Sequence, residues 1–583
     1  MYSMHMAHLH KKKKNGNTYY YLREMQRVNG KPKVIWQKYL GTADTMHKKL
    51  SESGSTGKPE KVRTLSFGAV FLLNELEKEL DTVGIIDSIV PRGKKETGPT
   101  VGEFFYYGWV NRIINPRSKR ALPDWYKHTA VQHIRPVELK ELTSQRYWEK
   151  FNRVSEKNVE EIAKSFFEKV WEKQSSPAEF LMFDTTNYYT FMNSRTDSEL
   201  CQRGHNKAGR HSLRQVGLGL LVDRKTCLPL YYKAYNGNMH DSKLFTAVMD
   251  QVFDAMCEFN KTEQSLTVIF DKGMNSDKNI NMIDGNSRFH FITTYSPSYV
   301  KDLASTPLEE FTPLDISNNK LRKGSSVPQE DLMVAYRSDK ELWGKRRTVV
   351  VTYNPRTYRK KEFTFNRKLK SIIETLLGFK LKYEAMEPQW RDPKEVEKRY
   401  CKKCRSLNIS SRYFDLSFDD TKDKPVMTYL KNTAEVESAK RLFGRSIIVT
   451  DNHRWSTDAI VQLSLDRYII ENEFRASKSK EHVRLNPIYH WTDSKIRCHL
   501  LMCVIALTVL RLLEIRVNAN RRKNRLSGKT IVDEMSNLDS VCLWYPRKRK
   551  AEQMLEEPTK VQGKILKSFG YGIEKGVLQN LST

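Results

Sequence analysis

The sequence has 583 residues, enough for several domains of roughly 100 to 200 residues each, and its 39% hydrophobic content is sufficient for real cores, which excludes a disordered chain. A total of 100 Lys and Arg against 69 Asp and Glu gives a net charge of +31 and a pI near 9.6. Such an excess favours a polyanionic partner, with nucleic acid as the leading candidate and a basic surface that binds nothing as the alternative.

The eight cysteines stand at irregular spacing, unlike a secreted disulfide scaffold, and the first residues lack the apolar segment of a signal peptide, so we expect an intracellular protein. The apolar run at residues 500–510 is too short for a membrane span of about 20 residues and predicts a buried core helix, in which Cys498 and Cys503 pack. Cys401 and Cys404 form a CxxC pair without a second pair or histidines at zinc-finger spacing, so packing is favoured there over a metal.

Residues 1–62 predict a small β-hairpin region followed by a linker. Segments 19–22 and 33–39 flank Asn29-Gly30, a strong signal for a tight hairpin turn, and residues 51–61 are polar. The lysine run at residues 11–14 is interpreted as a solvated tail, with phosphate contact as the alternative.

Residues 63–175 have helical periodicity and predict a helical DNA-binding region. Its middle is basic and aromatic: Arg117, Lys119 and Arg120 stand near Trp125 and Tyr126. This combination suits contacts to the DNA backbone with stacking, although surface arginines beside a core tryptophan are a common neutral outcome.

The remaining chain predicts a mixed α/β core that is interrupted once. Short runs of β-forming residues at 180–183, 215–222, 228–235, 266–270 and 289–293 predict strands, the first three antiparallel, and residues 241–260 predict a helix before the fourth. We therefore expect the first part of the core at residues 176–300 and an α+β insertion domain at residues 301–445. The second part of the core follows at residues 446–516 and contains a long helix from residue 456 to 480. Residues 517–583 are expected to form a basic, partly disordered tail.

Two acids follow apolar runs directly. Asp184 comes after residues 180–183, and Asp271 after residues 266–270, with Lys272 and Gly273 behind it. Asp often ends a strand by capping the next turn, so for either residue alone that role is about as expected as chemistry.

A third acid, Glu471, belongs to the long helix. Arg467, Glu471, Arg475 and Lys478 fall within an arc of roughly 80° at about 100° per residue, so they share one face beside an apolar stripe. The alternative is an ordinary ladder of ion pairs. Glu473 points elsewhere and is interpreted as a surface residue.

Three carboxylates from two strand ends and a helix are what two divalent metal ions require. Mg²⁺ prefers carboxylate oxygens, and a metal pair activates an attacking oxygen while it stabilises the leaving one. Adjacent lysines and arginines would hold a phosphodiester, which is phosphoryl-transfer chemistry.

These residues resemble the DDE transposases of prokaryotic insertion sequences, in the branch of the insertion-sequence-four superfamily with long N-terminal regions. The segments FDTTNYYTF, IFDKGMNSDKNI and TDNHRWSTDAIVQLSLDRYIIENEFRASKSK are similar to those that carry the family's first, second and third acids. Arg467, Glu471 and Lys478 match the last three positions of the motif Tyr-x2-Arg-x3-Glu-x6-Lys, whereas Ser464 replaces its tyrosine. In GHNKAGRHSLRQVGLGLLVD, Ala208 replaces a usual acid.

The resemblance implies a ribonuclease-H-like catalytic core with an insertion domain before the catalytic helix. It implies catalysis and metal binding by Asp184, Asp271 and Glu471 with Mg²⁺ or Mn²⁺ as cofactor. It also implies cleavage at the terminal inverted repeats of an element and transfer of the 3′-OH into target DNA. The DNA contacts that follow from the residues and from the resemblance together are Lys207, Arg210, Arg467, Arg475, Lys478, Arg117, Lys119 and Arg120.

The expected partner is double-stranded DNA, both element ends and target, bound by a homodimer in the cytoplasm and nucleoid of a prokaryotic cell, without a membrane. Two alternatives stay open: a DNA-binding repressor that descends from a transposase and no longer cuts, and a ribonuclease-H-like nuclease without strand transfer.

Overall fold

The computed structural model shows how the chain folds over most of its length. It describes residues 7–14, 17–28, 31–52, 59–173, 178–193, 195–204, 209–239, 244–246, 249, 265–320, 327–419, 424–479, 483–485, 487–521, 523–545 and 551–581. The turn predicted at Asn29-Gly30 and nearly all of the helix predicted at 241–260 lie outside these residues.

The chain forms two units, which we describe separately. The first contains Met1–His240, Ala247–Glu263 and Ile469–Thr583, and the second contains Asp241–Thr246 and Gln264–Tyr468. The second unit therefore interrupts the first in the sequence.

The first unit begins with an antiparallel sheet in the order β1-β2-β3, formed by β1 (Ala7–Lys14), β2 (Asn17–Val28) and β3 (Lys31–Gly41), and helix α1 (Ala43–Glu52) follows. The predicted pairing of the two segments around Asn29-Gly30 is confirmed. The solvated tail expected at residues 11–14 is wrong for Lys11. This residue lies in β1, and its ammonium pairs with the carboxylates of Asp539 at 2.8 Å and Glu556 at 3.2 Å.

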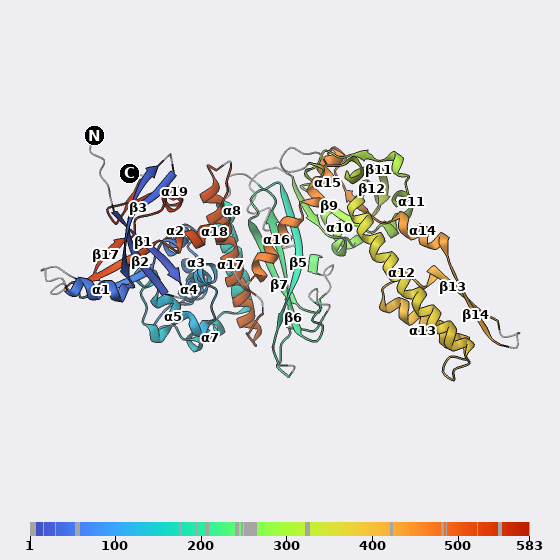
Figure 1. The fold of residues 1–583 in the computed structure, drawn as a ribbon, viewed down its shortest axis with the longest axis horizontal. Helices are drawn as coiled ribbons and strands as arrows, with labels where there is room; N and C mark the ends of the chain where they lie inside the picture. The colour runs from blue at the N-terminus through green and yellow to red at the C-terminus, as the bar shows by residue number, and fades with distance from the viewer. Residues whose placement is uncertain are drawn as a thin grey trace. The chain divides into compact units, whose positions relative to one another are not determined.

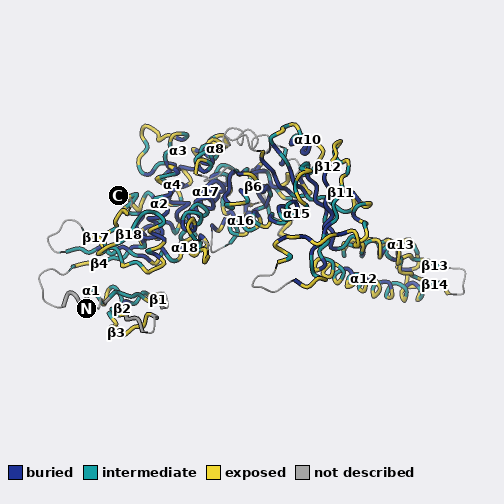
Figure 2. Tube along the Cα trace, turned by 90° about the horizontal axis from the view of Figure 1, so that it is seen from above, coloured by how far each residue is buried: buried dark blue, intermediate teal, exposed yellow. Residues whose placement is uncertain are grey.

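The predicted helical region is present and surrounds one buried helix, α17 (Asp493–Asn518). α17 packs against four helices of this region and against α18 (Gly528–Met535) (Figure 1). Its apolar residues 500–510 are buried, which confirms the core helix expected there, and Figure 2 shows it as a dark buried segment. The helices of the region are α2 (Gly68–Leu80), α3 (Thr82–Ile89), α4 (Val101–Ile114), α5 (Leu122–Lys127), α6 (Val131–Ile134), α7 (Ser144–Asn152) and α8 (Glu156–Glu172).

The three predicted antiparallel strands follow in the same unit. β5 (Phe180–Thr190), β6 (Arg214–Asp223) and β7 (Pro229–Asn236) pair in this order, with Asp184 opposite Leu220. β6 is buried almost throughout, because it lies between its two neighbours, and α8 and α17 pack against β7.

The expected C-terminal tail contains regular structure instead. β16 (Asp539–Trp544) pairs with β4 (Lys61–Ser66) and with β17 (Glu552–Leu555), and α19 (Lys560–Lys567), β18 (Tyr571–Glu574) and β19 (Val577–Asn580) follow. The basic composition was misleading, because Cys542, Ile565 and Leu566 are buried and hold these elements in place.

The second unit contains a mixed sheet in the order β10-β11-β12-β15-β9-β8, in which only β8 and β9 are parallel. Its strands are β8 (Leu266–Phe270), β9 (Phe289–Tyr295), β10 (Thr312–Pro313), β11 (Val334–Leu342), β12 (Lys345–Tyr353) and β15 (Arg445–Thr450), and its short helices are α10 (Asp277–Asp284) and α11 (Lys301–Ala304). With the helices of the first unit, this sheet confirms the predicted mixed α/β class.

The insertion is smaller than the predicted 301–445, because β10, β11 and β12 pair within this sheet. A separate α+β module follows β12 in the chain and precedes β15, and Figure 1 shows its helices and hairpin. It has its own apolar core. It contains α12 (Pro355–Glu384), α13 (Pro393–Ser406), the β-hairpin of β13 (Phe414–Asp419) and β14 (Val426–Lys431), and α14 (Thr433–Arg441).

Among the described helices, none combines the length and the apolar character that a membrane span requires.

Candidate active site

Asp184 lies inside a strand and not at its end. β5 continues past it to Thr190, because the residues that follow Asp184 are mostly β-branched or aromatic and extend the pairing with β6. The predicted strand end at this acid is therefore wrong. Its side chain is half-buried, and Oδ1 accepts the backbone N–H of Thr185 at 2.7 Å.

Asp271 follows β8 directly, as predicted, and is held by three donors. Oδ1 accepts the backbone N–H of Lys272 at 2.8 Å, the hydroxyl of Thr294 at 2.8 Å and the guanidinium of Arg467 at 3.1 Å. Burial alone would raise the pKa of this carboxyl, but Arg467 and the hydrogen bonds lower the pKa below its ordinary value. Asp271 is therefore ionised at neutral pH, and 43% of its side chain is exposed to solvent.

The long helix predicted from residue 456 to 480 is two helices. α15 (Thr457–Leu465) ends at Asp466, whose carboxylate accepts the amide of Gln462 at 2.7 Å, and α16 (Tyr468–Lys478) begins two residues later. Arg467 stands at this break and turns to Asp271 instead of continuing the helical face. Glu471 and Arg475 do lie on the exposed surface of α16, while Ile470 and Phe474 are buried.

The C-terminal end of α16 is attached to β5. The hydroxyls of Tyr188 and Ser477 lie 2.6 Å apart and are buried, and the ammonium of Lys478 donates to Thr186 and lies 5.4 Å from the ring centre of Tyr188. These contacts tie the helix that carries Glu471 to the strand that carries Asp184. The sequence did not predict the contact between Tyr188 and Ser477. The pattern of residue types along a strand indicates which side chains are buried, but it does not show which residue of another element each one contacts.

Glu473 is a buried residue and not the surface residue expected from the sequence. It is completely buried, and its Oε1 accepts Nε of Arg511, on α17, at 2.8 Å. Burial raises the pKa of this carboxyl although Arg511 opposes the shift. Glu473 therefore joins α16 to the core helix, which leaves Glu471 as the acid of this segment that is available to a ligand.

The predicted DNA contacts around the core strands and α16 have different surroundings. Lys207 lies outside the described residues. Arg210 is exposed and its guanidinium stacks on the ring of Tyr189, with 4.7 Å between them. Arg475 is exposed, whereas Lys478 is half-buried against β5.

The predicted DNA contacts in the basic segment of the helical region also differ in their exposure to solvent. Arg117 and Arg120 are exposed, as a phosphate contact requires. Lys119 contradicts the prediction, because its Nζ lies 3.1 Å from His490 Nε2 and 4.3 Å from the ring centre of Phe151, so it points into the protein. Burial, with Arg112 nearby, lowers the pKa of Lys119 to about 7.

The aromatic residues of this segment are core residues. Trp125 is 6% exposed and Tyr126 is 4% exposed, and the Tyr126 hydroxyl donates to the carbonyl of Arg135 at 3.1 Å. The predicted stacking on DNA is therefore wrong for both rings, and the neutral alternative describes them.

The donor types of the three acids fit a hard divalent cation, because Mg²⁺ prefers carboxylate oxygens. Within the part of the chain that the structure describes, no group of three or more His, Cys, Asp or Glu side chains could hold a metal ion. Asp184 and Glu471 belong to the first unit and Asp271 to the second, so their assignment to one site stays a prediction. Cys401 and Cys404, on α13, are free cysteines.

Comparison with known proteins identifies the family. No curated protein matches the sequence. The cryo-EM structure of the piggyBac transposase synaptic complex with hairpin DNA matches 82% of each chain at 8% identity with a TM-score of 0.37, a likeness too weak to support a conclusion. The family model of the transposase DDE domain matches residues 190–509, which is more than half of the 583 residues and includes Asp271 and Glu471, while Asp184 lies shortly before the match. The chain therefore belongs to the family of transposases with a DDE domain.

Proposed function

We propose that this chain cuts DNA at the terminal inverted repeats of a mobile element and joins the freed 3′-OH to target DNA. Its proposed catalytic and metal-binding residues are Asp184, Asp271 and Glu471. The family match is the observation that supports the proposal, because it is to a transposase DDE domain and spans the segment from Asp271 to Glu471.

Transposases of this family generally use divalent metal ions, and we propose Mg²⁺ or Mn²⁺ for this chain. The ion would activate the attacking oxygen and stabilise the leaving one. In strand transfer, the 3′-OH oxygen forms a bond to a target phosphorus while the bond from that phosphorus to its own 3′ oxygen breaks, and the leaving oxygen takes up a proton.

The cationic side chains near these acids are proposed to bind the DNA phosphates. Arg475 is exposed on the helix of Glu471. Arg467 contacts Asp271 at 3.1 Å, so it would place a positive charge beside this acid, and Lys478 would act from its position against β5. The spacing of Arg467, Glu471 and Lys478 supports the insertion-sequence-four superfamily, and through it a prokaryotic source. The proposed partner is double-stranded DNA, bound by a homodimer that pairs two element ends.

The test uses labelled duplexes from the DNA that flanks the coding sequence, a target plasmid and Mg²⁺. Asp184→Asn, Asp271→Asn and Glu471→Gln remove a charge and keep the shape of the side chain. Each variant should lose strand cleavage and retain binding to the duplex, because only the metal-binding carboxylate is changed. The matched control is Asp277→Asn, an exposed acid in the first turn of α10, which should cut normally.

Normal cleavage by any of the three variants would refute the role of that acid. The same reaction separates the alternatives. Wild-type protein that binds without cutting is the inactive repressor, and cutting without joined products indicates a nuclease without strand transfer.

A further inference from the structure

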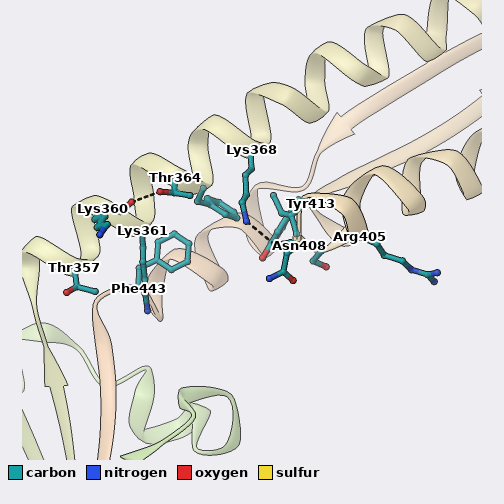
Figure 3. Close-up of a pocket in the computed structure, with 12 residues that line it drawn as sticks. Thr357, Lys360, Lys361, Thr364, Lys368, Arg405, Asn408, Tyr413 and Phe443 are labelled. Atoms are coloured by element: carbon teal, nitrogen blue, oxygen red, sulfur yellow. Dashed lines mark hydrogen bonds between the residues drawn. The ribbon is translucent and has the colours of Figure 1, made fainter. Parts of the chain in front are cut away.

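The α+β module of the second unit has a basic pocket along α12, which we call the α12 pocket. It has a volume of about 850 Å³ and lies between α12 and the segment that connects α13 to β13 (Figure 3). Lys360, Lys361 and Lys368 reach it from α12, and Arg405 reaches it from the end of α13. Among the described residues that line it there is no Asp or Glu.

The pocket is shaped by aromatic packing beneath these cations. The ring of Phe365 is buried and meets Tyr413 edge-on at 5.2 Å and Phe443 at 5.1 Å between ring centres. These contacts join α12 to the two segments that oppose it. The pocket therefore exists without a ligand, and its basic rim is held on a packed core.

The cations of the α12 pocket have no ionic partner among the described residues. Lys360, Lys361 and Arg405 are exposed, and none of the three forms an ion pair with any described residue. Lys368 is half-buried and its ammonium donates to the carbonyl of Asn408 at 3.3 Å. Elsewhere on α12, by contrast, Arg356 and Arg359 pair with Asp331. An uncompensated row of positive charge at a concave surface attracts an anion.

The spacing of the row fits a nucleic-acid backbone. From Lys360 to Lys368 the helix rises about 12 Å at 1.5 Å per residue. One strand of duplex DNA advances 3.4 Å per phosphate along its axis, so this length spans about 3.5 phosphate-to-phosphate steps, or about four successive phosphates. We propose that the α12 pocket binds the phosphate backbone of one strand of duplex DNA, an inference that rests on the proposed function because it names a surface for the same partner.

The experiment measures binding of the full-length protein to duplex DNA by fluorescence anisotropy over a range of salt concentrations, without divalent metal. The test variant is Lys360→Gln with Lys361→Gln, two exposed residues whose loss leaves the core of the module intact. Affinity decreases with salt, and the steepness of this decrease, the slope of log affinity against log salt, should become smaller by about 0.9 for each lost phosphate contact. The double variant should therefore have a slope smaller in magnitude by about 1.8 and should bind more weakly at low salt.

The matched control is Lys370→Gln with Lys394→Gln, which removes two exposed charges from the same module outside the pocket. Lys370 lies about 180° from Lys361 around α12, at about 100° per residue. The control should keep the wild-type slope. A second variant, Arg405→Gln, tests the pocket from α13 and should lower the slope by about 0.9.

Equal slopes for the pocket variant and the control would overturn the inference, as would a loss that appears with duplex RNA of the same sequence but not with DNA. Failure of the proposed function is a separate result. A protein that binds DNA through this pocket and never cuts it would refute the proposed function and leave the pocket assigned. A protein that cuts DNA, and whose pocket variant and control variant bind DNA equally well, would refute the assignment of the pocket and leave the proposed function in place.

Discussion

At the scale of single residues, the lysines of this basic chain differ in whether their charge faces solvent or the protein interior. Lys361 is exposed at the rim of the α12 pocket, whereas the ammonium of Lys119 lies against the rings of Phe151 and Tyr147 and beside His490. A charge that burial removes from water is costly, so the pKa of Lys119 falls to about 7. Composition counts both residues alike, although only one of them is available to DNA.

The first prediction concerns the pH dependence that Lys119 contributes to stability. Above pH 7 the folded state holds this lysine mostly neutral, while the unfolded state keeps it protonated up to its ordinary pKa of 10.5. The unfolded state then binds more protons, so the free energy of unfolding rises with pH through this window, by at most about 1.4 kcal/mol per pH unit.

Lys119→Met removes this contribution. The difference in unfolding free energy between wild type and variant should therefore shift in favour of the wild type between pH 7 and pH 9, as measured by urea denaturation at each pH. DNA affinity should stay unchanged in the variant. A difference that is constant with pH would contradict the depressed pKa of Lys119.

At the scale of elements, the position of α16 depends on a few buried polar contacts. Ser477 donates its hydroxyl proton to the carbonyl of Phe474, so Tyr188 donates in the 2.6 Å contact between the two hydroxyls. One turn earlier on the same buried face of the helix, Glu473 accepts from Arg511 of α17. The exposed Glu471 is therefore carried by a helix that is fixed to both β5 and the core helix.

The second prediction is that Tyr188→Phe loosens α16. The variant loses one buried hydrogen bond, which should cost about 1 kcal/mol of unfolding free energy. If the helix must be held for Glu471 to act, the rate of strand cleavage should fall while the affinity for DNA stays the same. Tyr189→Phe is the control, because Tyr189 is the adjacent strand residue and its side chain points to the opposite face. Equal effects of the two substitutions on cleavage would contradict the positioning role.

At the scale of the whole molecule, the α+β module is inserted at a single place in a sheet. Tyr353 at the end of β12 pairs with Arg445 at the start of β15, and the backbone N–H of Asn354 donates to the carbonyl of Gly444 at 2.9 Å. The two ends of the module therefore lie side by side. Its apolar core draws only on residues within it, from Phe365 to Phe443.

The third prediction follows from this arrangement. Residues 354–444 expressed alone should fold, because the core is complete and the ends meet without the sheet. Circular dichroism should show a helical spectrum with a cooperative thermal transition. A spectrum without helix, or melting without a transition, would show that the module depends on the sheet to which it is attached.

Much of the fold could be predicted from local patterns. The strands at β5 to β9, the core helix α17 and the hairpin of β2 and β3 appear where alternation, apolar runs and turn residues indicated them. Local patterns failed where two features compete at one position. The apolar run before Asp184 suggested a strand end, but the β-forming residues after it continue the strand.

The sequence by itself indicated the transposase family, which the family match confirms, and its charge of +31 favours a polyanionic partner. The catalytic roles of Asp184, Asp271 and Glu471 stay predictions. Tertiary structure alone decided which charged groups face solvent and which partner each one has. Arg467 leaves a helical face to pair with Asp271, Glu473 is buried against Arg511, and Lys119 is turned inward. The physical reason is that a periodic pattern fixes a direction around one element, whereas ion pairs and burial depend on residues of other elements that the pattern does not contain. In these three cases the partners lie 196, 38 and 371 positions away.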